Sequence, residues 1–369
     1  MNISFHYVSL IDFLALVQGV LLGIILIGGN RSNRPSLFLG LFLLSYSIEL
    51  LPSILEDSSF IESHPQFLFL PIRFLFLSPL LLYLYAKSLT QAISLTSSWP
   101  AFIPAALEVM VMTGLVIFLK IDQLDGQERI RMINGYQVYF YVGILYATVY
   151  SLMTIRFIHR HQKRVMDYFS NTKNKHLKWV KGIAVFLILF GLSWFVPLFL
   201  PDFVMEEVAI PFLSSINVIF IFWVGLSGLR QPSVDIQVEA STPKVIRMEP
   251  SINGDKQDEI FQSLKQIMRE EQLYKEPDLT LPTLAKRLNM TRRNLSQLIN
   301  QKTGGNFNLF INQYRIEEAK RLLSDSSFDH LNMLGIAMEA GFNSKATFFA
   351  VFKKIEGLSP GAYKQQHVQ

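Results

Sequence analysis

Cysteine is absent from this chain of 369 residues. Its absence excludes a disulfide framework, a thiolate zinc site and a cysteine nucleophile. Charged residues are also scarce at 17%, whereas hydrophobic residues make up 50% of the chain. Because an average soluble domain carries about 25% charged residues, this composition indicates that part of the chain lies in a lipid bilayer.

Motifs of several enzyme and transporter classes are missing too. The sequence has no His-Glu-x-x-His metal site, no Walker phosphate loop and no convincing internal repeat. The last apolar run, residues 208–229, has no lysine, which excludes a retinal Schiff base. We therefore expect no catalytic residue, no metal and no cofactor. A membrane transporter or membrane enzyme with a regulatory cytoplasmic tail stays open as the alternative.

Seven apolar runs stand out before residue 230. Each is about 18 to 23 residues long, the length that an α-helix needs to cross about 30 Å of hydrocarbon. The runs lie near residues 8–29, 36–54, 66–87, 100–119, 135–157, 181–200 and 208–229. Because a helix satisfies its own backbone hydrogen bonds, the sequence predicts seven uninterrupted membrane helices. The first is expected to be retained, since no basic residue precedes it and no small-residue cleavage pattern follows.

Lysine and arginine are unevenly divided between the loops that join these runs. With the amino terminus outside, eleven lie in or beside the inner loops: Arg31, Arg34, Lys87, Arg156, Arg160, Lys163, Arg164, Lys173, Lys175, Lys178 and Lys181. Three lie in the outer loops: Lys120, Arg129 and Arg131. Because positive residues stay on the cytoplasmic side, the amino terminus is predicted to be outside and everything after Arg230 inside.

Four ionisable residues stand out inside the predicted spans, where a charge costs about 2.5 to 3.5 kcal/mol on insertion scales, and they are Asp12, Glu49, Arg73 and Glu108. Asp12, Glu49 and Arg73 all lie roughly 6 to 9 Å below the outer surface when counted at 1.5 Å per residue. We expect Glu49 and Arg73 to neutralise each other and Asp12 to complete a signal pocket. The alternative is an ion pair that only fixes helix packing. Glu108, nearer the inner side, joins no cluster.

Residues 231–254 lose helical periodicity and contain three prolines, as expected of a linker. From residue 255 to residue 369, apolar positions recur at helical spacing without useful strand alternation. The predicted fold is therefore all-α. A polytopic seven-helix membrane bundle at residues 1–230 precedes a cytoplasmic all-helical domain.

Two helix-turn-helix patterns occur in that domain. In the first, Thr291 is a natural N-cap between LPTLAKRL and RRNLSQLINQK. In the second, residues 341–343 form the turn after LGIAMEA, and Ser344 caps KATFFAVFKKI. Between Leu279 and Ile316 the chain has no acidic residue and six basic ones: Lys286, Arg287, Arg292, Arg293, Lys302 and Arg315. Such a local excess of positive charge favours neutralisation of DNA phosphates.

The stretch from Leu279 to Lys364 resembles the DNA-binding domain of the AraC/XylS family of bacterial transcription regulators. Residues that stand at this family's spacing are Ala337, Gly341, Phe342, Ser344, Phe348, Phe352, Lys353, Gly357 and Pro360. The resemblance implies seven helices with two helix-turn-helix units joined by a long central helix. It also implies double-stranded promoter DNA and RNA polymerase as partners. Phe349 and Ala350 stand where many members have polar or basic residues, which predicts weaker base reading by the second unit.

Candidate DNA contacts lie on the helices that begin at Arg292 and Lys345, which we expect to enter successive major grooves about 34 Å apart. The base-edge candidates are Arg293, Ser296, Gln297, Asn300, Asn343, Lys345 and Thr347. The phosphate candidates are Arg292, Lys302, Lys353 and Lys354, beside the caps Thr291 and Ser344.

These features predict a one-component transcription regulator tethered in a bacterial inner membrane. The membrane bundle would sense a small ligand or a membrane signal, and the cytoplasmic domain would bind promoter DNA sequence-specifically. A homodimer would let a change in the bundle alter the spacing of two DNA-binding domains.

A reporter enzyme fused after Arg230 is expected to be active only inside the cell, and one inserted between Glu56 and Glu62 only outside. The reason is the excess of eleven inner over three outer positive residues. Alkaline phosphatase and β-galactosidase fusions at both positions measure this. Reversed signals would put the predicted DNA-binding domain on the wrong side of the membrane.

Overall fold

The computed structural model describes residues 7–29, 34–57, 71–90, 93, 95–118, 126–170, 177–196, 199, 201, 204–231 and 254–367. Among these residues, β pairing is limited to an isolated bridge between Phe169 and Thr280, so the observed class is all-α. The chain divides into two compact units, one of residues 1–158 and 177–240, the other of residues 159–176 and 241–369. Nearly all of the predicted linker lies outside the described residues.

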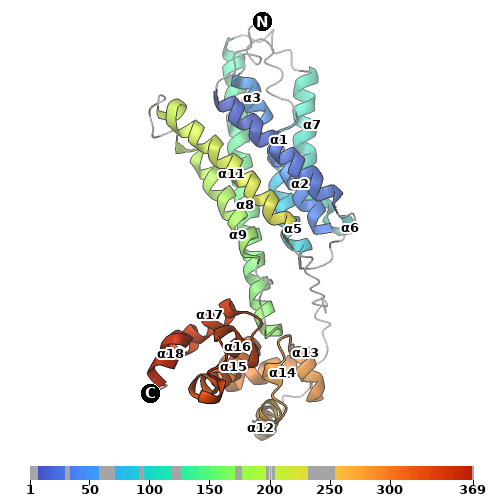
Figure 1. Ribbon diagram of the computed structural model, residues 1–369. Helices are drawn as coiled ribbons and strands as arrows, with labels where there is room; N and C mark the ends of the chain where they lie inside the picture. Colours follow the sequence, from blue (N-terminus) through green and yellow to red (C-terminus); the bar gives the residue numbers. More distant parts are fainter. Residues whose placement is uncertain are drawn as a thin grey trace. The chain divides into compact units, whose positions relative to one another are not determined.

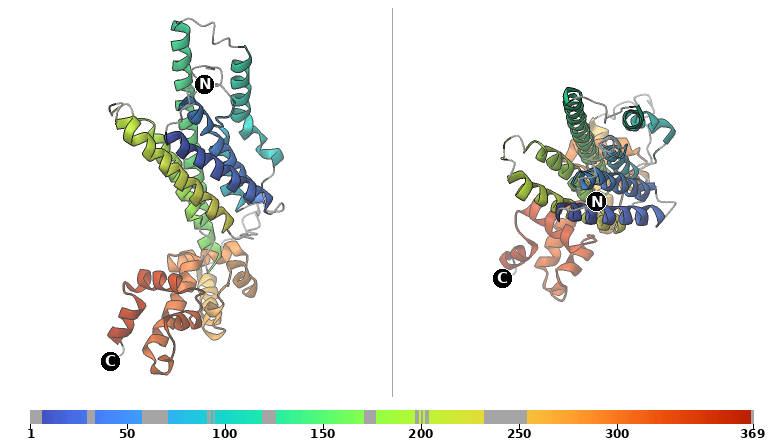
Figure 2. Two further views of the ribbon diagram at one scale, coloured as in Figure 1. Left: turned by 45° about the horizontal axis from the view of Figure 1, so that its top comes forward. Right: turned by 90° about the horizontal axis from the view of Figure 1, so that it is seen from above.

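The first unit contains α1 (Tyr7–Gly28), α2 (Arg34–Ile48), α3 (Leu51–Asp57), α5 (Leu77–Ser88), α6 (Leu95–Ser98), α7 (Ile103–Phe118), α9 (Lys178–Ser193), α11 (Ile210–Leu229) and the part of α8 (Gly126–Tyr168) up to residue 158. A 3₁₀-helix, Trp99–Phe102, and a π-helix, Met205–Ala209, lead into α7 and α11. The helix α1 packs against both α2 and α11, and α2 also packs against α5 (Figures 1 and 2).

Five helices in this region are long and apolar enough to cross a membrane, and they are Tyr7–Gly28, Pro35–Leu55, Trp99–Phe118, Gly135–Tyr168 and Glu207–Leu229. They coincide with five of the seven predicted spans. The helices in the third and sixth predicted spans are shorter, since α5 has 12 residues and α9 has 16.

The prediction of an uninterrupted third helix is wrong. Residues 71–76 form a turn in which Phe74 has a φ of 46°, and α5 begins only at Leu77. A helix from residue 66 would bury Pro79 in its interior, where the ring clashes with a preceding carbonyl. Starting at Leu77 places Pro79 in the first turn, where its missing N–H is not needed. Pro52 likewise lies in the first turn of α3, after a break at residues 49–50 that divides the second predicted span.

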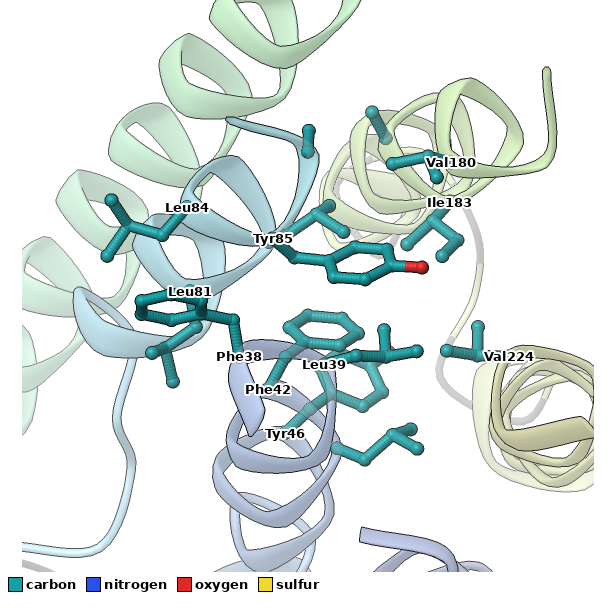
Figure 3. Packing of buried hydrophobic residues seen from close by; sticks show 14 of the residues in the cluster. Phe38, Leu39, Phe42, Tyr46, Leu81, Leu84, Tyr85, Val180, Ile183 and Val224 are labelled. Atoms are coloured by element: carbon teal, nitrogen blue, oxygen red, sulfur yellow. The ribbon is translucent and has the colours of Figure 1, made fainter. Parts of the chain in front are cut away.

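Aromatic and leucine side chains fill the centre of the first unit. Tyr85 of α5 lies among Phe42 of α2, Ile183 of α9 and their neighbours (Figure 3). On α2, Phe42 stacks on Tyr46 with 5.7 Å between ring centroids. These contacts hold α2, α5, α9 and α11 to one another through close packing.

The second unit has seven α-helices within residues 254–367, a range described without gaps. They are α12 (Gly254–Glu270), α13 (Leu281–Arg287), α14 (Arg292–Thr303), α15 (Phe307–Ser324), α16 (Met333–Glu339), α17 (Lys345–Glu356) and α18 (Pro360–His367). Two hydrophobic cores meet on α15, which gives Phe307, Phe310 and Ile311 to the first core and Ile316, Ala319, Leu322 and Leu323 to the second. The long central helix, which the resemblance implies, therefore belongs to both cores.

Replacing Gly341 with alanine is expected to destabilise the second unit by about 2 to 5 kcal/mol, from left-handed strain and steric overlap together. Gly341 has a φ of 90°, and a Cβ there would collide with the carbonyl oxygen of Tyr274 and lie 2.8 Å from Cα of Lys275. The matched control is Gly304→Ala, because Gly304 has a φ of 66° but no atom within 4 Å of the added Cβ.

Hydrogen exchange of the full chain in increasing urea, measured on residues 307–356, compares the two variants. The control is expected to lose only about 1 to 2 kcal/mol, the cost of the left-handed backbone alone. Equal losses would show that the close approach to Tyr274 does not constrain residue 341.

Candidate functional site

The first helix-turn-helix unit is formed by α13, a short turn and α14. Thr280 caps α13 by accepting a hydrogen bond from the Thr283 amide at 3.3 Å. Asn289 takes a left-handed φ of 51° in the turn, a conformation that asparagine tolerates. Thr291 then caps α14 by accepting from the Asn294 amide at 3.2 Å, as the sequence predicted.

One face of α14 is buried and the opposite face is polar. Leu295, Leu298 and Ile299 pack into the first core. Arg293, Gln297 and Asn300 are exposed at positions i, i+4 and i+7, so the structure brings these three base-edge candidates onto one stripe. Arg292 and Ser296 are half-buried beside that stripe. A polar helical stripe of this kind can present donors and acceptors to base edges in a major groove.

The second helix-turn-helix unit repeats this arrangement with α16 and α17. Asn332 caps α16, and Ser344 caps α17 by accepting from the Thr347 amide at 3.2 Å. Phe348 and Phe352 are buried in the second core, and the centroids of their two rings lie 5.6 Å apart. These aromatics fix the orientation of α17.

The polar face of α17 is less complete than that of α14. Lys345, Lys353 and Lys354 are exposed, but Asn343 and Thr347 are half-buried. The Ser344 hydroxyl donates to Thr347 Oγ1 at 2.9 Å, so Thr347 takes part in the cap. The Lys345 ammonium lies over the ring of Phe349, with its nitrogen 5.4 Å from the ring centre.

Several of the six basic residues counted in the sequence have other partners. Arg287 forms ion pairs with Glu271 and Glu276, at 2.7 and 3.1 Å. Lys302, a phosphate candidate, forms an ion pair with Asp258 at 2.6 Å. Lys286 and Arg293 are exposed, and Arg292 is half-buried. The cluster near the start of α14 is therefore smaller than the charge count indicated.

Arg315 is wrongly included in that cluster, because its side chain is only 1% exposed. Its Nε donates to the Tyr274 carbonyl at 2.7 Å, and its Nη2 donates to the Glu276 carbonyl at 2.8 Å. Its guanidinium carbon lies 5.7 Å from the ring centre of Phe342. Burial lowers the pKa of Arg315 to about 10, so the group stays charged at neutral pH. Arg315 links α15 to the segment Leu273–Glu276 and cannot contact DNA.

The three residues of the predicted signal pocket contact neighbouring side chains in the first unit. Ser53 donates to Asp12 at 3.2 Å, and Ser78 donates to Glu49 at 2.7 Å. Arg73 lies over the ring of Tyr136 at 5.2 Å. Pairing of Glu49 with Arg73 stays a prediction, and the turn at residues 71–76 replaces the helix on which the depth count for Arg73 relied.

Glu108 is a buried site that the sequence left unassigned. Its carboxylate accepts hydrogen bonds from the Leu75 and Phe76 amides, at 3.0 and 3.3 Å, and from the Tyr139 hydroxyl at 2.5 Å. Those amides lie where α5 begins, so a carboxylate from α7 compensates the unpaired donors of that helix. The position of one carboxylate in a sequence carries no signal for such a contact.

Residues 357–361 read Gly-Leu-Ser-Pro-Gly and match the spacing of a serine nucleophile elbow. That motif requires a turn from a strand into a helix. Here the segment joins α17 to α18, and Ser359 accepts a hydrogen bond from the Ala362 amide at 3.2 Å. The serine therefore caps a helix.

Comparisons with known proteins agree with this geometry. Residues 284–366 match a family described as a helix-turn-helix domain. The uncharacterized HTH-type transcriptional regulator YtdP of Bacillus subtilis is 32% identical over 91 residues, covering 25% of this chain and 11% of that protein. An uncharacterized HTH-type transcriptional regulator of Haemophilus influenzae is 33% identical over 88 residues, covering 24% of this chain and 28% of that protein.

Two solved structures are similar to part of the chain. The C-terminal domain of AraT, a response regulator from Geobacillus stearothermophilus, is 29% identical and covers 30% of this chain and 86% of that chain, with a TM-score of 0.26. The C-terminal domain of the two-component response regulator yesN from Fusobacterium nucleatum is 26% identical and covers 30% and 98%, with a TM-score of 0.25.

The family match identifies residues 284–366 as a helix-turn-helix domain, and the curated relatives are described as HTH-type transcriptional regulators. The matches cover about a tenth and about a quarter of the curated relatives' own lengths. The family match covers residues 284–366 and does not reach the apolar helices.

Replacing Arg293 or Gln297 with alanine is expected to weaken binding of the full chain to its selected DNA site by about 1 to 3 kcal/mol. Each change removes a base-edge contact, so preference at one or two base positions relaxes as well. Arg269→Ala and Gln313→Ala are matched controls, because both residues are exposed on helices other than α14 and α17. Unchanged affinity and footprint for both α14 variants would contradict this placement.

Proposed function

We propose that this protein is a membrane-tethered, one-component transcription regulator. Its C-terminal domain binds promoter DNA sequence-specifically, and its apolar helices hold it in a bacterial inner membrane and sense a signal. The observation that carries the proposal is the presence, in one chain, of two helix-turn-helix units with polar outer faces and five helices apolar enough to cross a membrane.

The surface of the first unit supports the membrane assignment. On α1, Leu10, Leu14 and Leu21 are each more than half exposed. These leucines recur at helical spacing on one side, while Asp12 and Ala15 are buried on the other. A soluble protein rarely exposes so large an apolar stripe, whereas lipid favours it. The excess of positive residues in the predicted inner loops supports a cytoplasmic position of the DNA-binding domain.

Buried carboxylates support a sensing role for the bundle. Asp12 and Glu108 are 4% and 6% exposed, and each accepts hydrogen bonds from another element. Such groups are expensive in a membrane and are a common feature of signal or ligand sites. Asp12, Glu49 and Arg73 remain the candidates for the signal pocket, and Glu108 joins them. A ligand that prefers one arrangement of these groups shifts the population of the whole chain. A second copy of the chain and RNA polymerase are the protein partners that the resemblance implies.

Selection of duplex DNA from a random library by the full chain in lipid nanodiscs tests the function directly. We expect enrichment of a motif with two half-sites about one helical turn apart, because two recognition helices of one domain contact successive grooves. Specific sites are expected to bind at least about 10³-fold more tightly than unrelated DNA.

The doubly substituted chain Arg293→Ala, Gln297→Ala is the matched control, and it is expected to lose the enriched motif. Binding without any sequence preference would contradict sequence-specific regulation. Solute flux into vesicles without DNA binding would instead favour the transporter alternative.

A further inference from the structure

We call residues 166–170 the tail: they are the last three residues of α8 and the two residues that follow it. The tail belongs to the second unit and docks on the helices of that unit. Phe169 forms an antiparallel bridge with Thr280, the residue that caps α13. The Ser170 amide donates to the Leu279 carbonyl at 3.2 Å, and the Ser170 hydroxyl donates to the same carbonyl at 2.8 Å. The tail thus pairs with the chain immediately before the first helix-turn-helix unit.

Three side chains on one face of α15 hold the tail from the other side. Asn308 Nδ2 donates to the Phe169 and Ser170 carbonyls, at 3.1 and 2.7 Å. Asn312 donates to Asn308 Oδ1 at 3.0 Å and so orients that amide. Arg315 Nη2 donates to Ser170 Oγ at 3.1 Å. Asn308, Asn312 and Arg315 are spaced i, i+4 and i+7, which places them on a single helical stripe. Ser170 is 2% exposed as a result.

The tail also reaches a candidate DNA contact. The guanidinium carbon of Arg292 lies 5.8 Å from the ring centre of Tyr168, within the range of a cation–π interaction. Arg292 is the first residue of α14. An arginine that stacks on Tyr168 is held in one rotamer and is partly screened from a phosphate.

We propose that the tail of α8 is a built-in restraint on DNA binding, which docks on the α13–α15 surface and engages Arg292. This inference rests on the proposed function, because it assumes that α14 binds DNA. The occupant of the surface is this chain's own segment. Because α8 also contains the candidate span Gly135–Tyr168, a movement of that span acts on the tail without passing through residues 231–253.

The tail can leave without dismantling the domain. No described side chain of the tail belongs to either hydrophobic core of the second unit. A cavity of about 320 Å³ borders it at Met166, between the ends of α14 and α17. The attachment includes hydrogen bonds and an aromatic contact with Arg292, whose net free energies in water are modest. An attachment of that strength suits a contact that forms and releases during signalling.

A disulfide that locks the tail in place tests the restraint. The chain contains no cysteine, so the variant F169C/T280C has one pair that can oxidise. Bridged residues on antiparallel strands lie about 4.5 to 5.5 Å apart, which a disulfide can span. In nanodiscs, the oxidised variant is expected to bind the selected DNA site at least about fivefold more weakly than the reduced variant. The single substitutions F169C and T280C are expected to show no response to oxidation.

Failure to form the disulfide under oxidation would overturn the docking itself. A disulfide that forms but leaves DNA affinity unchanged or higher would overturn the restraint while leaving the proposed function standing. If even the unaltered chain selects no DNA site, the proposed function fails, and the restraint fails with it. The three outcomes are therefore distinguishable in one set of measurements.

Substitution of Tyr168 tests the contact with Arg292 separately. Tyr168→Ala is expected to raise DNA affinity about two- to fivefold, since a cation–π pair of this exposed kind is lost. The slope of log DNA affinity against log salt concentration is expected to steepen by about one, the contribution of one added phosphate contact. Tyr168→Phe keeps the ring and is expected to match the unaltered chain. Equal affinity and salt slope for the alanine and phenylalanine variants would show that Tyr168 does not hold Arg292 away from DNA.

Discussion

The buried guanidinium of Arg315 is the contact on which the C-terminal unit depends. Taking an arginine out of water costs several kcal/mol unless its donors are satisfied. Here the Tyr274 and Glu276 carbonyls accept from the guanidinium, and Ser170 is a further acceptor while the tail is docked. The same side chain lies against Phe342 of the second helix-turn-helix unit. The guanidinium of Arg315 therefore contacts the segment before the first helix-turn-helix unit, Phe342 of the second helix-turn-helix unit, and the tail. Each acceptor compensates part of the cost of removing this charge from water.

The central position of α15 has a direct consequence for DNA recognition. Because α15 contributes to both hydrophobic cores, the relative placement of α14 and α17 is set by a single helix of 18 residues, about 27 Å long at 1.5 Å per residue. Gly341 allows the turn of the second helix-turn-helix unit to approach the Tyr274 backbone, which a residue with a Cβ would not permit without strain. The distance between α14 and α17 is therefore fixed by the packing of both helices on α15, and a change inside the domain would have to break that packing. Regulation then acts more readily on access to the domain than on its internal geometry.

Polar groups in the first unit follow the same principle of mutual compensation. Glu108 of α7 satisfies the free amides at the start of α5, which lets that helix begin at Leu77 inside an apolar region. Asp12 and Glu49 each accept from a serine hydroxyl. A hydrogen bond between side chains of two helices is sensitive to a small displacement of either helix. Such groups are suited to converting a shift of helices into a change of state.

The sequence by itself determined the features that depend on neighbouring residues. Caps at Thr291 and Ser344, the two helix-turn-helix units and the five long apolar helices follow from local hydrogen bonding and from periodicity within single segments. Only the tertiary structure decided that Arg315 is buried, whereas the charge count assigned it to the surface. Its contact with Ser170 joins residues 145 positions apart, and no pattern within either segment indicates it. The start of α5 belongs to the same class, because its unpaired amides are satisfied by a carboxylate 32 to 33 positions away on another helix. Burial of a charge is decided by which distant partners can satisfy it, and that choice exists only once the chain has folded.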